Sequence, residues 1–157
     1  MAHNRFADEV RAQIAEAVAL GATPLIDSSE FTADKGTDAY LAPQILINVN
    51  HKMRVMKDES FGPVVGIMAV ASDDEAVDLM NDSPFGLTAS IWTEDTDAAL
   101  AIGKRIETGT VFMNRCDYLD PALCWTGCKE TGRGASLSSL GYMSVTRAKS
   151  YHLKKHK

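Results

Sequence analysis

The sequence predicts an α/β protein with an open, mostly parallel sheet and crossover helices. Three apolar, β-rich runs, residues 63–70, 87–94 and 109–114, alternate with two helix-like segments. Strands that are buried on both faces and joined by helices run parallel, and their crossovers are right-handed. The 157 residues are the size of one ordinary domain, so we expect one domain.

The first predicted element is an amphipathic helix over residues 4–20. Phe6, Val10, Ile14 and Val18 recur every four residues, and charged side chains fill the positions between them. This pattern predicts a helix with one apolar face, and the stripe of four residues should be its buried side.

A loop and a strand follow this helix. Gly21 ends the helix, because glycine adopts positive φ without steric cost. A short apolar piece and a polar stretch rich in Ser, Asp and Gly then predict a loop or an irregular hairpin. Alternating apolar side chains at Ile45, Ile47 and Val49 predict a strand within residues 41–49.

Both segments between the three apolar runs carry helix signals. Ser72 and Glu75 have the spacing of a capping box, in which each side chain accepts a hydrogen bond from the other residue's backbone N–H. Asp95 or Thr96 can cap the second helix, and Gly109 lies just past its end.

The regular order ends at Asn114. Residues 115–136 hold a proline and several glycines and predict one long loop. Loops of about twenty residues are uncommon in compact domains and are often functional. A short helix is expected at 136–143, and the alternation over 144–155 predicts a final strand.

The composition excludes several classes of protein. With 21 Asp and Glu against 16 Lys and Arg, the net charge of -5 gives no electrostatic reason to bind nucleic acid. No apolar run approaches the ~18–20 residues that span a bilayer, and the first residues have no signal-peptide core. We therefore expect a cytoplasmic protein with neither a nucleic-acid nor a membrane partner.

Cys116, Cys124 and Cys128 lie close together in the predicted long loop. An odd number of cysteines cannot pair fully, which favours a reducing compartment. Cys124 and Cys128 are four residues apart, but Trp125 and Gly127 between them favour a loop and no histidine is near in sequence. We therefore expect no metal site.

The stretch ESFGP raises the first functional question. Glu59 could accept two hydrogen bonds from the paired hydroxyls of a ribose, and Phe61 could lie against a flat heterocycle. Alternatively, Glu59 is a solvated or capping acid and Phe61 a core anchor before a turn. The residues by themselves leave both interpretations open.

Four stretches, taken in order, carry a resemblance to a known family. They are ESFGPVVGIMAV, NDSPFGLTASIWTED, GTVFMN and WTGCKETGRG. Together they resemble the C-terminal part of the catalytic domain of the aldehyde dehydrogenases, which oxidise aldehydes with NAD or NADP. The resemblance implies the α/β fold of that portion, a small aldehyde as substrate and a homo-oligomer.

The resemblance also implies site residues. Glu59 matches the family acid that holds the nicotinamide ribose hydroxyls, and Phe61 matches the aromatic residue beside the nicotinamide. Asn114 closes the strand before the substrate-entrance loop, and Cys116 lies in that loop. Trp125 stands where the family commonly has a phenylalanine lining the aldehyde pocket.

The remaining matches are structural. Lys129 and Gly132 match a Lys-x-Ser-Gly stretch of the family. The end of the chain resembles the closing strand that pairs with a neighbouring subunit. We therefore divide the chain into a partial catalytic domain, residues 1–143, and a C-terminal tail, residues 144–157, that forms an oligomerisation strand.

Two family motifs are absent from this sequence. The nucleophilic cysteine usually stands in a Gly-Gln-x-Cys stretch and the general-base glutamate in Leu-Gly-Gly surroundings, and neither occurs here. The resemblance thus assigns no catalytic residue to this chain and implies a fragment without the Rossmann-like half. We expect it to be inactive alone and to bind no cofactor tightly, with NAD or NADP serving the intact enzyme.

A second interpretation is a non-catalytic interaction protein with the same fold. A partial domain would expose apolar surface, and a large exposed patch favours association. Such a protein would form a defined oligomer without affinity for a cofactor. A free-standing nucleotide-binding regulator is disfavoured, because Glu59 and Phe61 give too few contacts for useful affinity.

Overall fold

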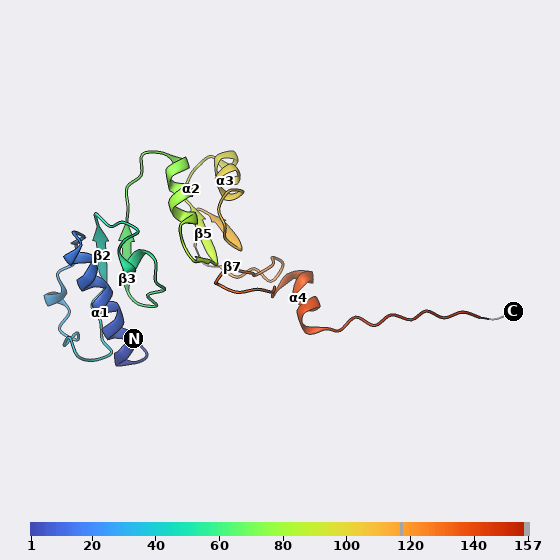
Figure 1. Ribbon diagram of the computed structural model, residues 1–157, viewed down its shortest axis with the longest axis horizontal. Coiled ribbons are helices and arrows are strands. Elements are labelled where there is room, and N and C mark those ends of the chain that lie inside the picture. The colour runs from blue at the N-terminus through green and yellow to red at the C-terminus, as the bar shows by residue number, and fades with distance from the viewer. Residues whose placement is uncertain (117, 156–157) are drawn as a thin grey trace. The chain divides into compact units, whose positions relative to one another are not determined.

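The computed structural model describes residues 1–116 and 118–155. It confirms the α/β class, with helices and small sheets; in the described residues the two four-residue strand pairs are parallel and the two two-residue pairs are antiparallel (Figure 1). The chain forms two compact units, Met1–Glu75 and Ala76–Lys157. Each unit has its own strands and its own buried apolar cluster.

Helix α1, Asn4–Ala19, opens the first unit, and the side chain of His3 accepts a hydrogen bond from a backbone N–H of its first turn. Gly21 has a φ of 107°, as expected of a glycine that ends a helix. The helix is confirmed, and of its predicted apolar stripe Val10 is buried and Ile14 packs against the core, but the prediction is wrong for Phe6 and Val18, which are 44% and 41% exposed. Its buried residues are Ala7, Val10, Gln13 and Ala17.

The helical repeat explains this difference. A spacing of exactly four residues turns about 40° past one full turn at each step, so a stripe of that spacing winds around the helix. The buried residues are instead spaced by three and four, which keeps them on one face. Gln13 therefore lies in the buried face although its side chain is polar.

The sheet of the first unit has the order β1–β2–β3. β1, Thr23–Pro24, pairs antiparallel with β2, Gln44–Ile47, and β2 pairs parallel with β3, Val64–Ile67. Two short 3-10 turns, η1 at Ser28–Glu30 and η2 at Arg54–Met56, lie in the connections. The core of the first unit joins α1 and the residues just after it to β2 and the loop after β2. Its buried members are Ala17, Ala22, Leu46, Val49 and Met53.

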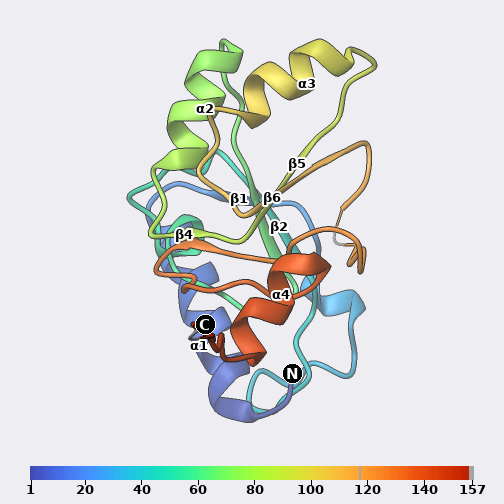
Figure 2. The same ribbon diagram turned by 90° about the vertical axis from the view of Figure 1, so that its right-hand side faces the viewer.

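The second unit is built on the parallel pair β5, Thr88–Ile91, and β6, Thr110–Met113. Helices α2, Asp73–Asn81, and α3, Thr96–Gly103, lie side by side next to this pair (Figure 2). The buried core residues come from α2, β5 and the segment after α3; they are Val77, Ala89 and Ile106.

Both predicted helix starts are present. The Ser72 hydroxyl accepts a hydrogen bond from the Glu75 N–H at 3.2 Å, and the Glu75 carboxylate accepts one from the Ala71 N–H at 2.6 Å. In a regular capping box the Glu75 carboxylate would accept from the N–H of Ser72 itself. Here it accepts from the N–H of the preceding residue, Ala71. The Asp95 carboxylate accepts a hydrogen bond from the Ala98 N–H at 3.0 Å, which identifies Asp95 as the cap of α3.

The pairing of the strands differs from the single sheet that we expected. β3 takes β2 as its parallel neighbour, and β5 takes β6. Each of these pairs extends over four residues. The strands β3, β5 and β6, which we expected in one sheet, therefore pair in two separate sheets, each within its own unit. Periodicity identifies strands but not their partners, which tertiary packing decides.

The predicted loop 115–136 is not wholly irregular. β7, Cys128–Lys129, pairs antiparallel with β4, Phe85–Gly86, and Trp125 forms a bridge with Ser136. Residue 117 of this loop lies outside the described residues. The short helix expected at its end is present as α4, Ser138–Val145.

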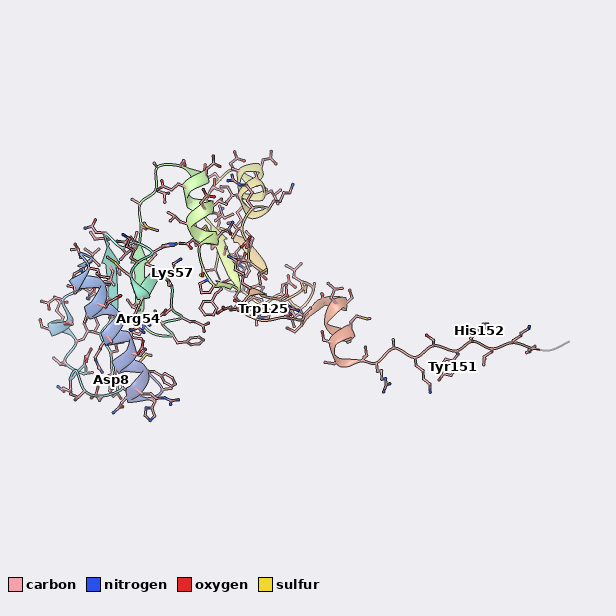
Figure 3. All side chains as sticks on the ribbon, viewed as in Figure 1. Asp8, Arg54, Lys57, Trp125, Tyr151 and His152 are labelled. Carbon is pink, nitrogen blue, oxygen red and sulfur yellow. The ribbon has the colours of Figure 1, made fainter. Side chains whose placement is uncertain are left out.

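After α4 the described residues 146–155 are exposed and in no helix or strand (Figure 1). Tyr151 and His152 project from this extended segment (Figure 3). The expected strand over 144–155 is wrong at residues 144–145, which belong to α4. A strand that pairs with a second chain stays a prediction, as does the division at residue 143; residues 156–157 lie outside the described part.

Candidate functional site

The first group of candidate residues lies on the loop between η2 and β3. The Glu59 carboxylate is exposed, and within residues 1–116 and 118–155 it makes no hydrogen bond or ion pair. Phe61 is 80% exposed and has a φ of 44°, in the left-handed region that non-glycine residues rarely adopt. Phe61 is therefore not a core anchor, and both side chains are available to a ligand.

Ion pairs restrain the residues next to Glu59 in the sequence. Arg54 pairs with Asp58, with 2.9 Å between Nε and Oδ2, and also with Glu9 of α1. Its hydrogen bonds to Glu9 and Asp58 raise the pKa of Arg54 above its usual range. Neither Arg54 nor Gln13, which contacts the same loop, stood out in the sequence, because a lone arginine or glutamine carries no motif.

Asn114 follows β6 directly and has a φ of 54°. Its side-chain Oδ1 accepts a hydrogen bond from the Thr93 N–H at 2.9 Å, and its Nδ2 donates one to the Thr93 carbonyl at 2.7 Å. These bonds join the carboxyl ends of β5 and β6, where ligands gather in parallel sheets. In this structure the amide of Asn114 is thus used to fasten two strand ends.

Cys116 is an exposed free thiol two residues beyond Asn114. The Arg115 guanidinium beside it lies 4.0 Å from the centre of the Tyr118 ring, a cation–π contact. The Ser90 hydroxyl donates a hydrogen bond to the Arg115 carbonyl, which ties this stretch to β5. Cys124 and Cys128 are half-buried free thiols.

Trp125 is half-buried and held by two backbone hydrogen bonds with Ser136, at 2.8 and 2.9 Å. It borders a hollow of about 390 Å³ with residues of the 131–136 loop. Among the described residues, neither Asn114 nor Cys116 lines this hollow. The structure therefore places Trp125 at one cavity and the other two candidates at the end of β6.

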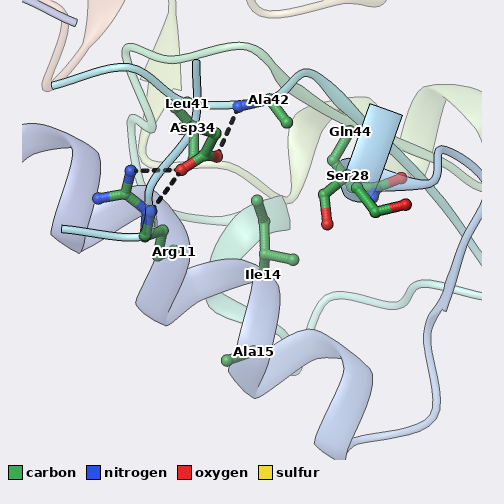
Figure 4. A pocket seen from close by; sticks show the side chains of 10 residues that line it. Arg11, Ile14, Ala15, Ser28, Asp34, Leu41, Ala42 and Gln44 are labelled. Carbon is green, nitrogen blue, oxygen red and sulfur yellow. Dashed lines mark hydrogen bonds and ion pairs between the residues drawn. The ribbon is translucent and has the colours of Figure 1, made fainter. Parts of the chain in front are cut away.

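A larger hollow, of about 450 Å³, lies in the first unit beside α1 (Figure 4). Arg11 and Asp34 both line it and form an ion pair, with 2.9 Å between Nη2 and Oδ1. The Asp34 carboxylate also accepts hydrogen bonds from the Ala42 and Gly36 N–H groups at 2.8 and 2.9 Å. These two N–H groups, together with Arg11, lower the pKa of Asp34. The polar groups here bind one another and so attach the loop around Asp34 to α1.

Neither a membrane span nor a metal cluster is found in the part of the chain that the structure describes. No helix there is long and apolar enough to cross a membrane. In the same residues, no three His, Cys, Asp or Glu side chains come together in a way that could hold a metal ion.

Comparison with known proteins identifies relatives. The model of the aldehyde dehydrogenase family matches residues 1–151. The chain is 35% identical over 141 residues to the Escherichia coli succinate semialdehyde dehydrogenase [NAD(P)+] Sad, covering 90% of this chain and 30% of that protein. It is also 35% identical over 133 residues to the benzaldehyde dehydrogenase YfmT of Bacillus subtilis, covering 84% of this chain and 26% of the relative.

A solved structure agrees with these matches. Succinic semialdehyde dehydrogenase from Streptococcus pyogenes, in complex with NADP+, superimposes with a TM-score of 0.81 at 31% identity. The match covers 90% of this chain and 30% of that one. This chain spans less than a third of the length of each of these three relatives. From the family match and the identity to curated relatives, the chain belongs to the aldehyde dehydrogenase family.

Proposed function

We propose that this chain supplies the C-terminal part of the catalytic domain of a cytoplasmic, homo-oligomeric, NAD- or NADP-dependent aldehyde dehydrogenase. The enzyme would oxidise a small aldehyde to the carboxylic acid. The observation that carries this proposal is the pair of Glu59, an exposed carboxylate without a hydrogen-bond or ion-pair partner among the described residues, and Phe61, an exposed ring two residues on.

These two side chains suit one end of a nicotinamide cofactor. A free carboxylate can accept hydrogen bonds from both vicinal hydroxyls of a ribose, and bonds to a charged acceptor are the stronger kind. An exposed aromatic ring can pack beside the flat nicotinamide. Bound NAD or NADP supplies the acceptor for the hydride that leaves the aldehyde carbon. Glu59 and Phe61 would hold that acceptor in place, and we call them the ribose clamp.

Substrate-side roles are proposed for Asn114, Cys116 and Trp125. Asn114 would keep the ends of β5 and β6 together beneath the entrance for the aldehyde, since its side chain already bonds to Thr93. Cys116, being exposed, would border that entrance, and Trp125 would form an apolar wall. None of the three acts as nucleophile in this proposal.

The Glu59→Gln substitution tests the clamp. The protein is produced as encoded, with any in-frame sequence upstream of codon 1, and formation of reduced nicotinamide is followed with a small aldehyde. Losing hydrogen bonds to a charged acceptor should raise the KM for the cofactor by about 10- to 100-fold. Glu30→Gln, at an exposed acid on η1 of the same unit, is the control. An unchanged cofactor KM in Glu59→Gln would contradict the proposal.

The 157-residue chain alone is expected to be inactive, because it contains neither family motif for the nucleophile or the general base. The purified chain is incubated with NAD or NADP and a small aldehyde, and its intact mass is verified. Steady oxidation of the aldehyde by this preparation would refute the expectation.

The exposed C-terminal end favours a second candidate, a non-catalytic oligomer. Val145, Tyr151 and Leu153 are 82%, 71% and 86% exposed, and apolar side chains so exposed favour association. Light scattering separates the candidates when combined with cofactor titration. A discrete oligomer of the 157-residue chain, from a gene with a stop codon upstream of Met1, would favour this alternative.

A further inference from the structure

The loop that carries the ribose clamp rests on α1 at alternate residues. The Ser60 hydroxyl donates a hydrogen bond to the side-chain oxygen of Gln13 at 2.6 Å. Gly62 lies so close to the helix that a Cβ placed on it would be 2.7 Å from Cγ2 of Val10. Ser60 and Gly62 are therefore fixed against the buried face of α1, while Phe61 between them is exposed.

Asp58 is held from the other end of the loop. Its carboxylate bonds to Arg54, which also pairs with Glu9 of α1. The Arg54 backbone N–H donates a further hydrogen bond to Glu16 of α1 at 3.1 Å. Residues 58, 60 and 62 are thus restrained by contacts with α1 or with Arg54. Their neighbours 59 and 61 carry the two free side chains of the clamp.

Gln13 is the contact among these that is hardest to explain as packing. It is 1% exposed and lies among the alanine and valine side chains of the buried face. A buried amide is costly unless it is hydrogen-bonded, so an apolar residue would serve the core at least as well. A hydrogen bond, unlike an apolar contact, has a direction, and this one is aimed at Ser60.

The backbone of Phe61 also needs such restraint. A non-glycine residue with positive φ persists where its surroundings over-determine it, and such residues gather at ligand sites. Ser60 and Gly62 flank Phe61, and both contact α1. These contacts supply the surroundings that hold Phe61 in its left-handed conformation.

We infer that Gln13, acting through Ser60, is a positioning residue of the ribose clamp, and that α1 is the support on which the clamp is built. This inference rests on the proposed function. It goes beyond that function because α1 contacts the clamp loop while contributing no side chain of its own to the ribose clamp. Order in residues 58–62 and affinity for the cofactor should therefore change together.

The first measurement is amide hydrogen exchange in the full chain, resolved to the peptide that contains residues 58–62. Ser60→Ala removes the donor to Gln13, and we expect about tenfold faster exchange of these amides. Ser60→Thr keeps a hydroxyl and should restore slow exchange. Ser28→Ala, the same change at an exposed serine of the first unit, is the control. Unchanged exchange in peptides of α1 and β2 verifies that each variant is folded.

The second measurement couples the loop to the cofactor. In the protein produced with its in-frame upstream sequence, Ser60→Ala should raise the cofactor KM several-fold, up to about tenfold. The same substitution in a Glu59→Gln background should add little, because the clamp has already lost its carboxylate. A serine that merely stabilises the fold would act equally in both backgrounds.

The outcomes are distinct. Faster exchange in residues 58–62 together with a KM effect that depends on Glu59 supports the inference. A cofactor KM that rises in Glu59→Gln but not in Ser60→Ala, with unchanged exchange, overturns the inference and leaves the proposed function intact. A cofactor KM that is unchanged in Glu59→Gln overturns the proposed function, and the positioning role of Gln13 with it.

Discussion

Asn48 and Asn114 occupy equivalent places after two different strands. Each directly follows the last residue of a parallel strand, β2 or β6, and their φ angles are 59° and 54°. Each side chain then donates to a residue of another segment, Asn48 to the Thr23 hydroxyl at 3.2 Å and Asn114 to the Thr93 carbonyl. Asparagine tolerates the left-handed region better than most residues, so it suits a sharp exit from a strand.

Asp34 is the residue whose protonation should affect stability most directly. Its pKa is lowered mainly by the N–H groups of Ala42 and Gly36, and Arg11 adds to the effect. A carboxyl with a lower pKa in the folded state stabilises the fold above its unfolded-state pKa of about 3.9. That contribution is lost as the pH falls from this value through the lower folded-state pKa.

We expect Asp34→Asn to lower the free energy of unfolding by about 1–2 kcal/mol at neutral pH. The difference from wild type should shrink as the pH falls below about 4, since both proteins are then neutral at this site. Thermal unfolding followed by circular dichroism over a pH series measures it. Asp8→Asn, which removes an exposed partner of Arg11, is the control and should cost less. A difference that is independent of pH would contradict the assignment to Asp34.

At the scale of elements, β7 is bound to the rest of the second unit by more than its two-residue pairing with β4. The Lys129 ammonium donates to the carbonyls of Asn81 and Ser83 at 2.6 and 3.0 Å and pairs with Glu107 at 2.7 Å. Its side chain is 23% exposed, so these bonds are partly shielded from water. Lys129 thus joins β7 to the end of α2 and to the segment after α3.

Lys129→Met keeps much of the side-chain volume but removes all three contacts. We expect it to lower the free energy of unfolding by about 1–3 kcal/mol, because two carbonyls lose a charged donor. Urea denaturation followed by tryptophan fluorescence of Trp92 and Trp125 measures the change. Glu107→Gln removes the ion pair while keeping both carbonyl bonds, and should cost under about 1 kcal/mol. If the two substitutions lowered the free energy of unfolding equally, the hydrogen bonds from Lys129 to the Asn81 and Ser83 carbonyls would contribute nothing to stability.

At the scale of the whole molecule, the described C-terminal residues 146–155 leave their apolar side chains exposed; Tyr151 is 71% and Leu153 86% exposed. Every described residue from 146 to 155 is exposed, and the segment alternates Tyr151 and Leu153 with polar side chains. An extended segment of this kind can pair with a strand edge of another copy, which would satisfy its backbone and cover its apolar side chains.

Deleting residues 146–157 should therefore lower the mass of the assembled protein in solution. Light scattering of the wild-type and shortened chains at several concentrations measures this. Leu153→Ser should weaken the association by less than the deletion, and Lys155→Ser is the matched control for a change in the same segment. A wild-type chain that is monomeric, or an assembly unaffected by the deletion, would contradict a role in oligomerisation.

The sequence alone identified the α/β class and, among the described residues, the four longer strands β2, β3, β5 and β6 and the four α-helices, because hydrophobic periodicity and capping residues act locally. The motifs around Glu59 and Gly109 also sufficed to recognise the aldehyde dehydrogenase family, which the family match over residues 1–151 confirms. Local patterns were enough in both cases, since a helix period or a short motif is contained in neighbouring residues.

Tertiary structure decided which strands pair, which face of α1 is buried and what surrounds Glu59. Periodicity at four-residue spacing pointed to Phe6 and Val18, whereas packing buried Ala7 and Gln13. The partnership of Gln13 with Ser60 joins residues 47 apart in sequence, and that of Lys129 with Asn81 joins residues 48 apart. Contacts between such distant residues leave no local pattern, because they form only when packing brings separate segments together.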